Sequence, residues 1–197
     1  MKRILDIIIS FFTLLIFGPF IIFLIIIQTF DTKQFGIFRQ IRVGMKGKLF
    51  YVYKIRTMIK NKSIITNITT SKDSRITERG KFLRKYKFDE LPQFFNVFIG
   101  DMSIVGPRPD VKDFIGKINH EEREILISIK PGITGPSSLE LINEEEILAN
   151  VSDPERYNME VIWPRKFELI KKYINNYSIS YDIKIIFKTI VFILKKI

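Results

Sequence analysis

The chain has 197 residues, no cysteine, one histidine and a net charge of +11 at pH 7. This length fits a single domain with a real hydrophobic core, and the lack of cysteine excludes disulfides, thiolate metal sites and thiol catalysis. The positive charge predicts an anionic partner, and nucleic acid, an anionic membrane surface and a phosphorylated small molecule all fit it.

Residues 7–27 form an almost unbroken apolar segment, in which only Ser10 and Thr13 are polar. A helix of this length reaches across a hydrocarbon core of about 30 Å. Gly18-Pro19, near its middle, predicts a kink, because proline removes a backbone donor and clashes with the preceding turn. Both flanks are basic, and basic flanks favour the cytoplasmic side. Two topologies therefore remain open: a kinked spanning helix, and a re-entrant helix that breaks at Gly18-Pro19 and returns.

The segment that follows predicts a β-hairpin. Residues 35–43 and 48–55 alternate apolar and polar side chains, and Gly44-Met45-Lys46-Gly47 separates them. We interpret the two glycines as turn residues, because the sequence lacks a GxxxxGK(S/T) phosphate loop. Residues 61–73 are rich in Thr, Ser and Asn and predict a flexible loop.

Two adjacent carboxylates, Asp89 and Glu90, follow a predicted helix over residues 78–86 and lie at the start of a second helix that Gly100 ends. Acidic residues at a helix start can simply cap it and compensate its dipole. Carboxylates are also acids, bases and covalent nucleophiles. One cap does not need two carboxylates, and basic residues crowd the pair in sequence, which favours a catalytic site. These residues are Arg75, Arg79, Lys81, Arg84, Lys85, Lys87 and Arg108.

Arg108 lies between Pro107 and Pro109, which restrict the backbone on both of its sides. A guanidinium on so stiff a backbone suits bidentate phosphate recognition, although a rigid loop with a solvated arginine is the alternative. Further along the chain, we interpret Glu144-Glu145-Glu146 as a solvated helix face.

The C-terminal segment, residues 181–197, predicts an amphipathic helix. Lys184, Lys188 and Lys195 share one stripe, and apolar side chains cover much of the rest. A basic stripe beside a broad apolar face favours a helix that lies in a membrane interface. A terminal helix packed on the core is the alternative.

Together these motifs resemble the small monotopic phosphoglycosyl transferases, bacterial sugar transferases that begin glycan assembly on a polyprenyl phosphate. Four stretches covering nearly the whole chain carry the resemblance. They are Lys2-Arg3-Ile4-Leu5-Asp6 with the proline-broken segment; Gln40-Ile41-Arg42-Val43-Gly44 with Lys54-Ile55-Arg56-Thr57-Met58; Leu83-Arg84 through Asp89-Glu90-Leu91-Pro92-Gln93 to Gly106-Pro107-Arg108-Pro109; and Lys130-Pro131-Gly132-Ile133-Thr134-Gly135 with Asn176-Tyr177-Ser178 and Asp182-Ile183-Lys184.

The resemblance implies an α+β, mostly helical fold. Residues 1–30 would form a re-entrant membrane helix, and residues 31–197 a catalytic domain that includes the small β-hairpin and a C-terminal interfacial helix. The catalytic domain would lie on the cytoplasmic face of the bacterial inner membrane, against its inner leaflet.

The resemblance also implies a ping-pong reaction. Asp89 would attack a UDP-sugar and release UMP, and polyprenyl phosphate would then take the sugar phosphate from Asp89. Mg²⁺ is the implied cofactor, with Glu90 and Asp89 as its ligands. The implied substrate-binding residues are Arg84, Arg108, Lys54, Arg56, Gln93 and Pro107.

Residues 136–166 depart from the family pattern, so the sugar is not transferred from any relative. Direct transfer through a ternary complex is the alternative mechanism, and a non-catalytic membrane scaffold for glycan enzymes is the alternative function. We expect no nucleic-acid binding, because no basic helix is interleaved with stacking aromatic residues.

Overall fold

The computed structural model describes residues 1–60 and 69–195. In chain order its elements are α1 (Lys2–Thr32), β1 (Ile37–Val43), the 3₁₀ turn η1 (Met45–Gly47), β2 (Leu49–Ile55), α2 (Glu78–Lys85), the 3₁₀ turn η2 (Phe88–Glu90), α3 (Gln93–Ile99) and β3 (Ser103–Val105). They continue with α4 (Lys112–Lys117), α5 (His120–Ile127), β4 (Gly132–Thr134), α6 (Pro136–Glu140), α7 (Glu144–Leu148), α8 (Pro154–Tyr157), the π-helical turn η3 (Asn158–Ile162), α9 (Trp163–Asn175) and α10 (Ile179–Leu194). The predicted mostly helical α+β class is confirmed.

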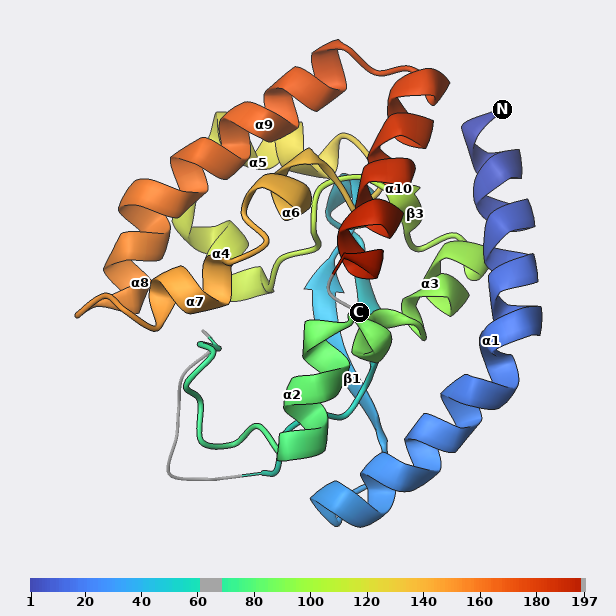
Figure 1. Ribbon diagram of the computed structural model, residues 1–197. Coiled ribbons are helices and arrows are strands. Elements are labelled where there is room, and N and C mark those ends of the chain that lie inside the picture. Colours follow the sequence, from blue (N-terminus) through green and yellow to red (C-terminus); the bar gives the residue numbers. More distant parts are fainter. Residues whose placement is uncertain (61–68, 196–197) are drawn as a thin grey trace.

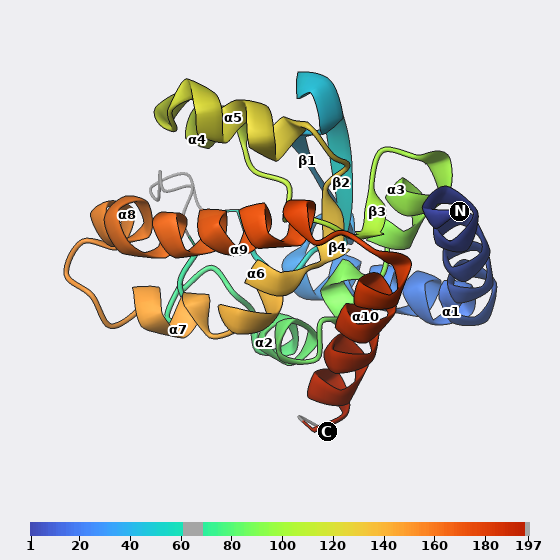
Figure 2. The ribbon, with the colours of Figure 1, turned by 90° about the horizontal axis from the view of Figure 1, so that it is seen from above.

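Figures 1 and 2 show α1 along one side of the molecule and α4, α5 and α8 on the opposite side. The hairpin and the short strands lie between these two groups of helices. The catalytic residues predicted from the sequence come from this central part of the fold.

Helix α1 is long and apolar enough to cross a membrane. The expected break at Gly18-Pro19 is a bend and not an interruption, because helical structure runs continuously from Lys2 to Thr32 with Pro19 inside it, and Figure 1 shows α1 bending near its middle. A proline removes a single helical hydrogen bond, and the apolar residues on both sides continue the helix.

Both ends of α1 are attached to the rest of the protein. At the N-terminal end, Lys2 donates a hydrogen bond to the Val105 carbonyl at 3.0 Å and pairs with the buried Asp182. Nearby, the buried Asp6 accepts hydrogen bonds from the Ser103 hydroxyl at 2.9 Å and from the Ile104 amide at 3.1 Å. These contacts tie α1 to β3 and α10.

In the second half of α1, Ile21 and Leu24 pack with Ile55 of β2 and Leu83 of α2 in one buried cluster. Gly36, just after α1, lies so close to it that an added Cβ would meet the Ile25 carbonyl oxygen at 2.0 Å. The two halves of α1 therefore contact the same body of the protein.

The predicted hairpin is confirmed. Strands β1 and β2 pair antiparallel, with Gln40 opposite Val52 and Phe38 opposite Lys54. Helix α3 packs against the hairpin, where the buried Asn96 side chain accepts from the Tyr53 amide and donates to the Tyr51 carbonyl. This contact fixes the hairpin relative to the segment that carries the acidic pair.

A short parallel pair of strands, β3 and β4, supports the loop that carries Arg108. The two backbones approach so closely that a Cβ on Gly132 would lie 2.1 Å from the Gly106 nitrogen. The Gly132 amide also donates to the Pro107 carbonyl at 2.8 Å. Glycine is required at this contact, because any side chain would separate the strands.

The predicted C-terminal helix is present as α10, and its two faces differ. Asp182 and Ile185 are buried against the core, whereas Ile183, Phe187 and Ile190 are exposed. One face thus packs on the protein, and the other leaves apolar side chains available to a membrane interface. Of the loop predicted over residues 61–73, residues 61–68 lie outside the described part of the chain.

Candidate active site

The turn η2 holds Asp89 and Glu90, and both side chains are buried. Lys87 precedes it in the left-handed conformation, with φ of 59°, and this reverses the chain after α2. Helix α3 begins only at Gln93, and neither carboxylate is a side-chain cap for it. Within the described residues, the Asp89 Oδ1 atom is buried without a hydrogen-bond partner. Helix capping therefore does not account for this pair.

Glu90 is compensated by two cations from distant parts of the chain. Its Oε1 atom accepts a hydrogen bond from Lys54 of β2 at 3.0 Å and another from Arg108 at 2.7 Å. Burial alone would raise the pKa of Glu90, but Arg108 and Lys54 together hold it well below its usual range. Glu90 is thus a permanent anion at neutral pH.

Asp89 has the opposite electrostatic environment. Burial and the negative charge of Glu90 raise its pKa to about 6, against the lowering influence of Lys54, Lys87 and Arg84. Burial likewise lowers the pKa of Lys54 to about 8, although Glu90 opposes that change. At neutral pH, Asp89 is therefore a mostly ionised carboxylate with little solvation, which is the state required of a nucleophile.

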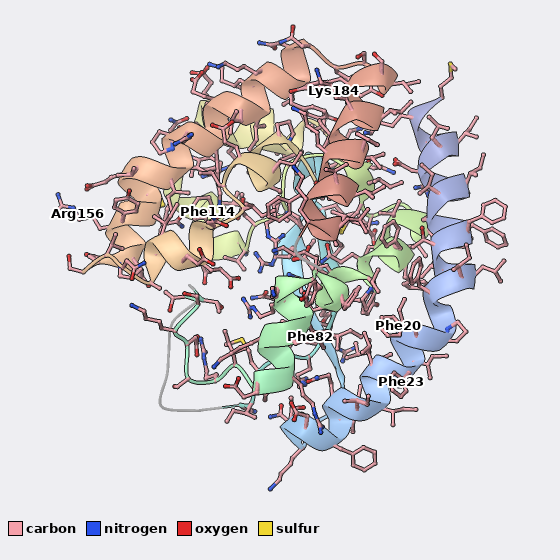
Figure 3. All side chains as sticks on the ribbon, viewed as in Figure 1. Phe20, Phe23, Phe82, Phe114, Arg156 and Lys184 are labelled. Carbon is pink, nitrogen blue, oxygen red and sulfur yellow. The ribbon has the colours of Figure 1, made fainter. Side chains whose placement is uncertain are left out.

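The acidic pair opens into a cavity of about 1810 Å³. Its wall includes residues from α1, the hairpin, α2, η2, the Arg108 loop, α4, α6, α7, α8, α9 and α10. Figure 3 shows Phe114 and Arg156 on the side of the molecule formed by α4, α7 and α8, and Phe82 on α2 below them. Basic side chains that line the cavity are Arg42, Lys54, Arg56, Lys60, Arg75, Lys81, Arg84, Lys85, Lys87, Arg108, Lys117, Arg156 and Lys166.

Four of the residues predicted to bind substrate line this cavity, but they lie in different surroundings. Arg108 and Lys54 contact Glu90 directly. Arg84 projects from α2 and pairs with Glu145 of α7. Arg56 donates to the Phe35 carbonyl at 2.8 Å and lies over the Phe38 ring at 5.5 Å, so it is held at the edge of the hairpin.

Gln93 and Pro107 are placed differently. Among the described residues that line the large cavity, neither of them occurs. Gln93 is buried, and the structure describes no partner for its Nε2 atom. Pro107 is also buried. Its carbonyl accepts a hydrogen bond from the Gly132 amide, and this contact supports the loop that carries Arg108.

The interpretation of the acidic run at residues 144–146 as a solvated helix face does not include the ion pairs that two of its members form. Glu144 pairs with Lys166 of α9 at 2.7 Å, and Glu145 pairs with Arg84. Only after folding does α7 turn these carboxylates toward a basic cavity, since local sequence contains no sign of their distant partners. Glu146 is exposed, as expected.

Arg42 and Asp110 also line the cavity and were not selected from the sequence. Burial lowers the pKa of Arg42 to about 10 and raises the pKa of Asp110. Arg42 donates to the Pro109 carbonyl at 3.1 Å. The hairpin register could have identified Arg42 from the sequence. Side chains alternate between the two faces of a strand, and residues 42 and 54 share one face.

The carboxylates of the acidic pair are the donor groups that could hold Mg²⁺ in this cavity. Among the residues described, no cluster of three or more His, Asp or Glu could hold an ion by itself. Mg²⁺ commonly takes one or two carboxylates and completes its shell with substrate phosphates and water. Asp89, with its unpartnered Oδ1, and Glu90 fit a partial site of that kind.

The comparisons with known proteins agree with this architecture. The sequence profile described as "Bacterial sugar transferase" matches residues 1–196. The uncharacterized sugar transferase EpsL of Bacillus subtilis (strain 168) is 33% identical over 190 residues, which cover 96% of this chain and 85% of EpsL.

Two longer relatives match over a part of their length. The UDP-glucose:undecaprenyl-phosphate glucose-1-phosphate transferase of Klebsiella pneumoniae is 37% identical, over 96% of this chain and 39% of its own. The galactosyl transferase CpsE of Streptococcus agalactiae is 40% identical, over 96% of this chain and 41% of its own. The chain thus spans about two fifths of these longer relatives. With the profile match along almost its full length, this chain belongs to the bacterial sugar transferase family.

Proposed function

We propose that this protein transfers a sugar 1-phosphate from a UDP-sugar to polyprenyl phosphate and releases UMP. The observation that carries the proposal is the buried Asp89, whose Oδ1 has no partner within the described structure, beside a Glu90 that two cations neutralise. Among the relatives, the Klebsiella pneumoniae enzyme is named for the same type of transfer, from UDP-glucose to undecaprenyl phosphate. This would be the first membrane step of a bacterial glycan pathway.

The reaction has two displacements at one phosphorus atom. First, an Asp89 oxygen attacks the phosphorus that carries the sugar, and the bond to the bridging oxygen breaks, so that UMP leaves with that oxygen. Second, an oxygen of polyprenyl phosphate attacks the same phosphorus, and the bond to Asp89 breaks. The products are a polyprenyl diphosphate sugar and the regenerated carboxylate, as expected for covalent catalysis.

The residues around Asp89 suit the charge that this reaction concentrates. Phosphoryl transfer depends mainly on positioning and on neutralisation of negative charge. Arg108 and Lys54 neutralise Glu90 and supply further donors at the cavity wall, and Arg84 adds a guanidinium from α2. Mg²⁺, held by Asp89 or Glu90 together with the diphosphate, would supply additional charge neutralisation.

The attachment of α1 supports a re-entrant placement in the membrane. A straight helix of 31 residues is about 45 Å long, so a spanning α1 would carry its two ends to opposite faces of the bilayer. Here Lys2 pairs with Asp182 at one end, and Leu24 packs with Leu83 toward the other. The bent helix would thus enter and leave on the cytoplasmic face, and the exposed apolar face of α10 would rest in the inner leaflet.

The decisive experiment is intact-protein mass spectrometry on detergent-solubilised enzyme, with Mg²⁺ and a panel of UDP-sugars but without lipid acceptor. We expect a mass increase equal to one sugar phosphate, and its loss in Asp89→Asn. Asp101→Asn is the matched control, because it removes a carboxylate that is part-exposed and pairs at 3.7 Å with Lys48. The adducted sugar would identify the donor.

Three other results would change the proposal. UMP release that appears only when polyprenyl phosphate is added, without an adduct, would show direct transfer in a ternary complex. Full turnover by Asp89→Asn would exclude Asp89 as the nucleophile, and an absence of both adduct and UMP across the panel would favour a scaffold.

Topology can be tested separately, because the chain has no native cysteine. A cysteine added ahead of Met1 and a Phe35→Cys variant should both react with a membrane-impermeant maleimide from the cytoplasmic side. Phe35 is 69% exposed just beyond α1. Labelling of the two positions from opposite sides would establish a spanning helix instead.

A further inference from the structure

The cavity that contains the acidic pair is also lined by carboxylates that pair with its basic residues. Glu145 of α7 pairs with Arg84 of α2, 61 residues away in sequence. Glu144, its neighbour, pairs with Lys166 of α9. Both glutamates line the cavity that contains Asp89, so α7 places negative charge where a diphosphate substrate has to bind.

Further contacts hold α7 against the segment that leads into α2. The Ser71 amide donates to the Glu145 carbonyl at 3.1 Å, and Lys72 donates to the Asn150 side chain at 3.0 Å. Figure 1 shows α7 directly above this segment. Together with the Arg84–Glu145 pair, these contacts join the two sides of the cavity.

The electrostatic influence of α7 extends toward the catalytic centre. The negative charge of Glu90 raises the pKa of the Arg108 guanidinium, and the charge of Glu144 raises it further, to a smaller extent. Arg84, for its part, lies close enough to Asp89 to help lower the pKa of that carboxyl. Arg84 and Arg108, which the α7 carboxylates influence, are therefore residues that would otherwise contact the phosphates of a donor.

We propose that Glu145 is an internal competitor of the donor's phosphate for Arg84, and so sets the affinity of the site for nucleoside diphosphate sugars. The inference rests on the proposed function and deepens it. A guanidinium satisfied by one carboxylate must exchange this partner before it binds a phosphate bidentately. Donor binding would then release α7 from α2, and Arg84 would contact the donor.

The size of the effect follows from the exposure of the pair. The Arg84 side chain is 19% exposed and the Glu145 side chain 44% exposed. Ion pairs this close to solvent are weak. Removal of such a competitor should therefore lower the dissociation constant of the phosphate ligand about two- to fivefold. The expected change is therefore modest and needs a matched control.

The test is isothermal titration calorimetry in detergent on the whole 197-residue chain. UMP and inorganic pyrophosphate are titrated separately. Glu145→Gln should bind both probes about two- to fivefold more tightly than wild type. Glu146→Gln makes the same charge change on the same helix and in the same cavity wall, at an exposed position outside the Arg84 contact, and should bind like wild type. In an Arg84→Gln background, Glu145→Gln should no longer tighten binding, because a double-mutant cycle isolates the pair.

A second measurement follows α7 itself. The Ala149 amide donates to the Glu145 carbonyl and the Ile147 amide to the Asn143 carbonyl. If the phosphate displaces Glu145, hydrogen exchange of these two amides should rise in wild type when UMP is added. The rise should be smaller in Glu145→Gln, where the helix is already released.

The outcomes separate this inference from the proposed function. Tighter binding of pyrophosphate by Glu145→Gln alone, with no UMP binding by any variant, would support the competitor role and contradict a uridine donor. Equal effects of the two glutamine variants, or weaker binding by Glu145→Gln, would overturn the inference while the adduct experiment still supports the function. Failure of every variant to bind either probe would also overturn it.

Discussion

Lys54 on β2 donates a hydrogen bond of 3.0 Å to Glu90 in the turn η2, so a strand of the hairpin neutralises half of the acidic pair. Arg108 donates to the same oxygen at 2.7 Å. Asp89, next in sequence to Glu90, receives no such bond on its buried Oδ1 within the described structure. Two adjacent carboxylates thereby acquire different protonation behaviour.

The pH dependence of turnover should report this difference. In the proposed mechanism Asp89 must be ionised to attack phosphorus, and its pKa is raised to about 6. Lys54 must be protonated to compensate Glu90, and its pKa is lowered to about 8. We expect kcat/KM for the donor to rise through about pH 6 and to fall through about pH 8. Because the ionisable groups interact, these two apparent pKa values belong to the coupled groups together. A profile flat between pH 5 and 9 would contradict both assignments.

Lys54→Arg tests the falling limb alone. Arginine keeps its charge at every accessible pH, so the fall near pH 8 should move upward by more than one pH unit while the rise near pH 6 remains. Lys48→Arg is the control, because that lysine is 77% exposed and lies outside the cavity. A fall that stays at pH 8 in Lys54→Arg would assign it to another group.

Asp89→Asn should stabilise the protein at neutral and alkaline pH. A carboxyl whose folded pKa lies above its unfolded value stabilises the fold below the unfolded pKa, and that contribution is lost as pH rises through about 6. The variant should therefore gain about 1–3 kcal/mol at pH 8 and little at about pH 3, below both pKa values. Thermal unfolding followed by fluorescence of the buried Trp163 measures it, and an equal gain at both pH values would argue against a desolvated charge.

Glu90→Gln should have the opposite effect on stability. Without this carboxylate, Lys54 and Arg108 lose the oxygen to which both donate, and loss of one partner of a buried pair costs about 3 kcal/mol. The loss should appear at pH 7 as a lower unfolding temperature together with loss of turnover. The double variant Lys54→Met/Glu90→Gln should recover part of the stability but none of the activity, and a neutral single variant would disprove the charge arrangement.

Two glycine substitutions test how α1 is attached. In Gly36→Ala the new Cβ would meet the Ile25 carbonyl oxygen at 2.0 Å, so the end of α1 has to move, at about 1–3 kcal/mol. In Gly18→Ala the structure shows no atom within 4 Å of the new Cβ among the described residues. Denaturation in detergent should therefore show a loss only for Gly36→Ala, and equal losses would mean that the contact does not hold α1 in place.

Much of the fold follows from local sequence patterns. Alternation with an intervening turn predicts the hairpin, the apolar run predicts α1, and Gly100, with φ of 101°, ends α3 as expected. The kink predicted at Pro19 is present as a bend in a continuous helix, because one lost hydrogen bond does not terminate a long apolar helix. These features depend on contacts between near neighbours, and the sequence contains such information directly.

The composition of the site was equally accessible. Absence of cysteine left carboxylates as candidates, and the Asp89-Glu90 pair followed from its unusual position among basic residues. The stiff loop around Arg108 was visible in its two prolines. The chemical groups available to this protein were therefore determined by the sequence itself.

Only the tertiary structure decided how those groups are paired. It joined Glu90 to Lys54 and Arg108, left Asp89 Oδ1 unpartnered within the described residues, and turned Glu145 toward Arg84. It also placed Arg56 at the edge of the hairpin and buried Gln93. Charges separated by tens of residues interact only once the backbone has brought them within a few ångströms and excluded water, and burial then shifts their pKa values in ways that no local pattern encodes.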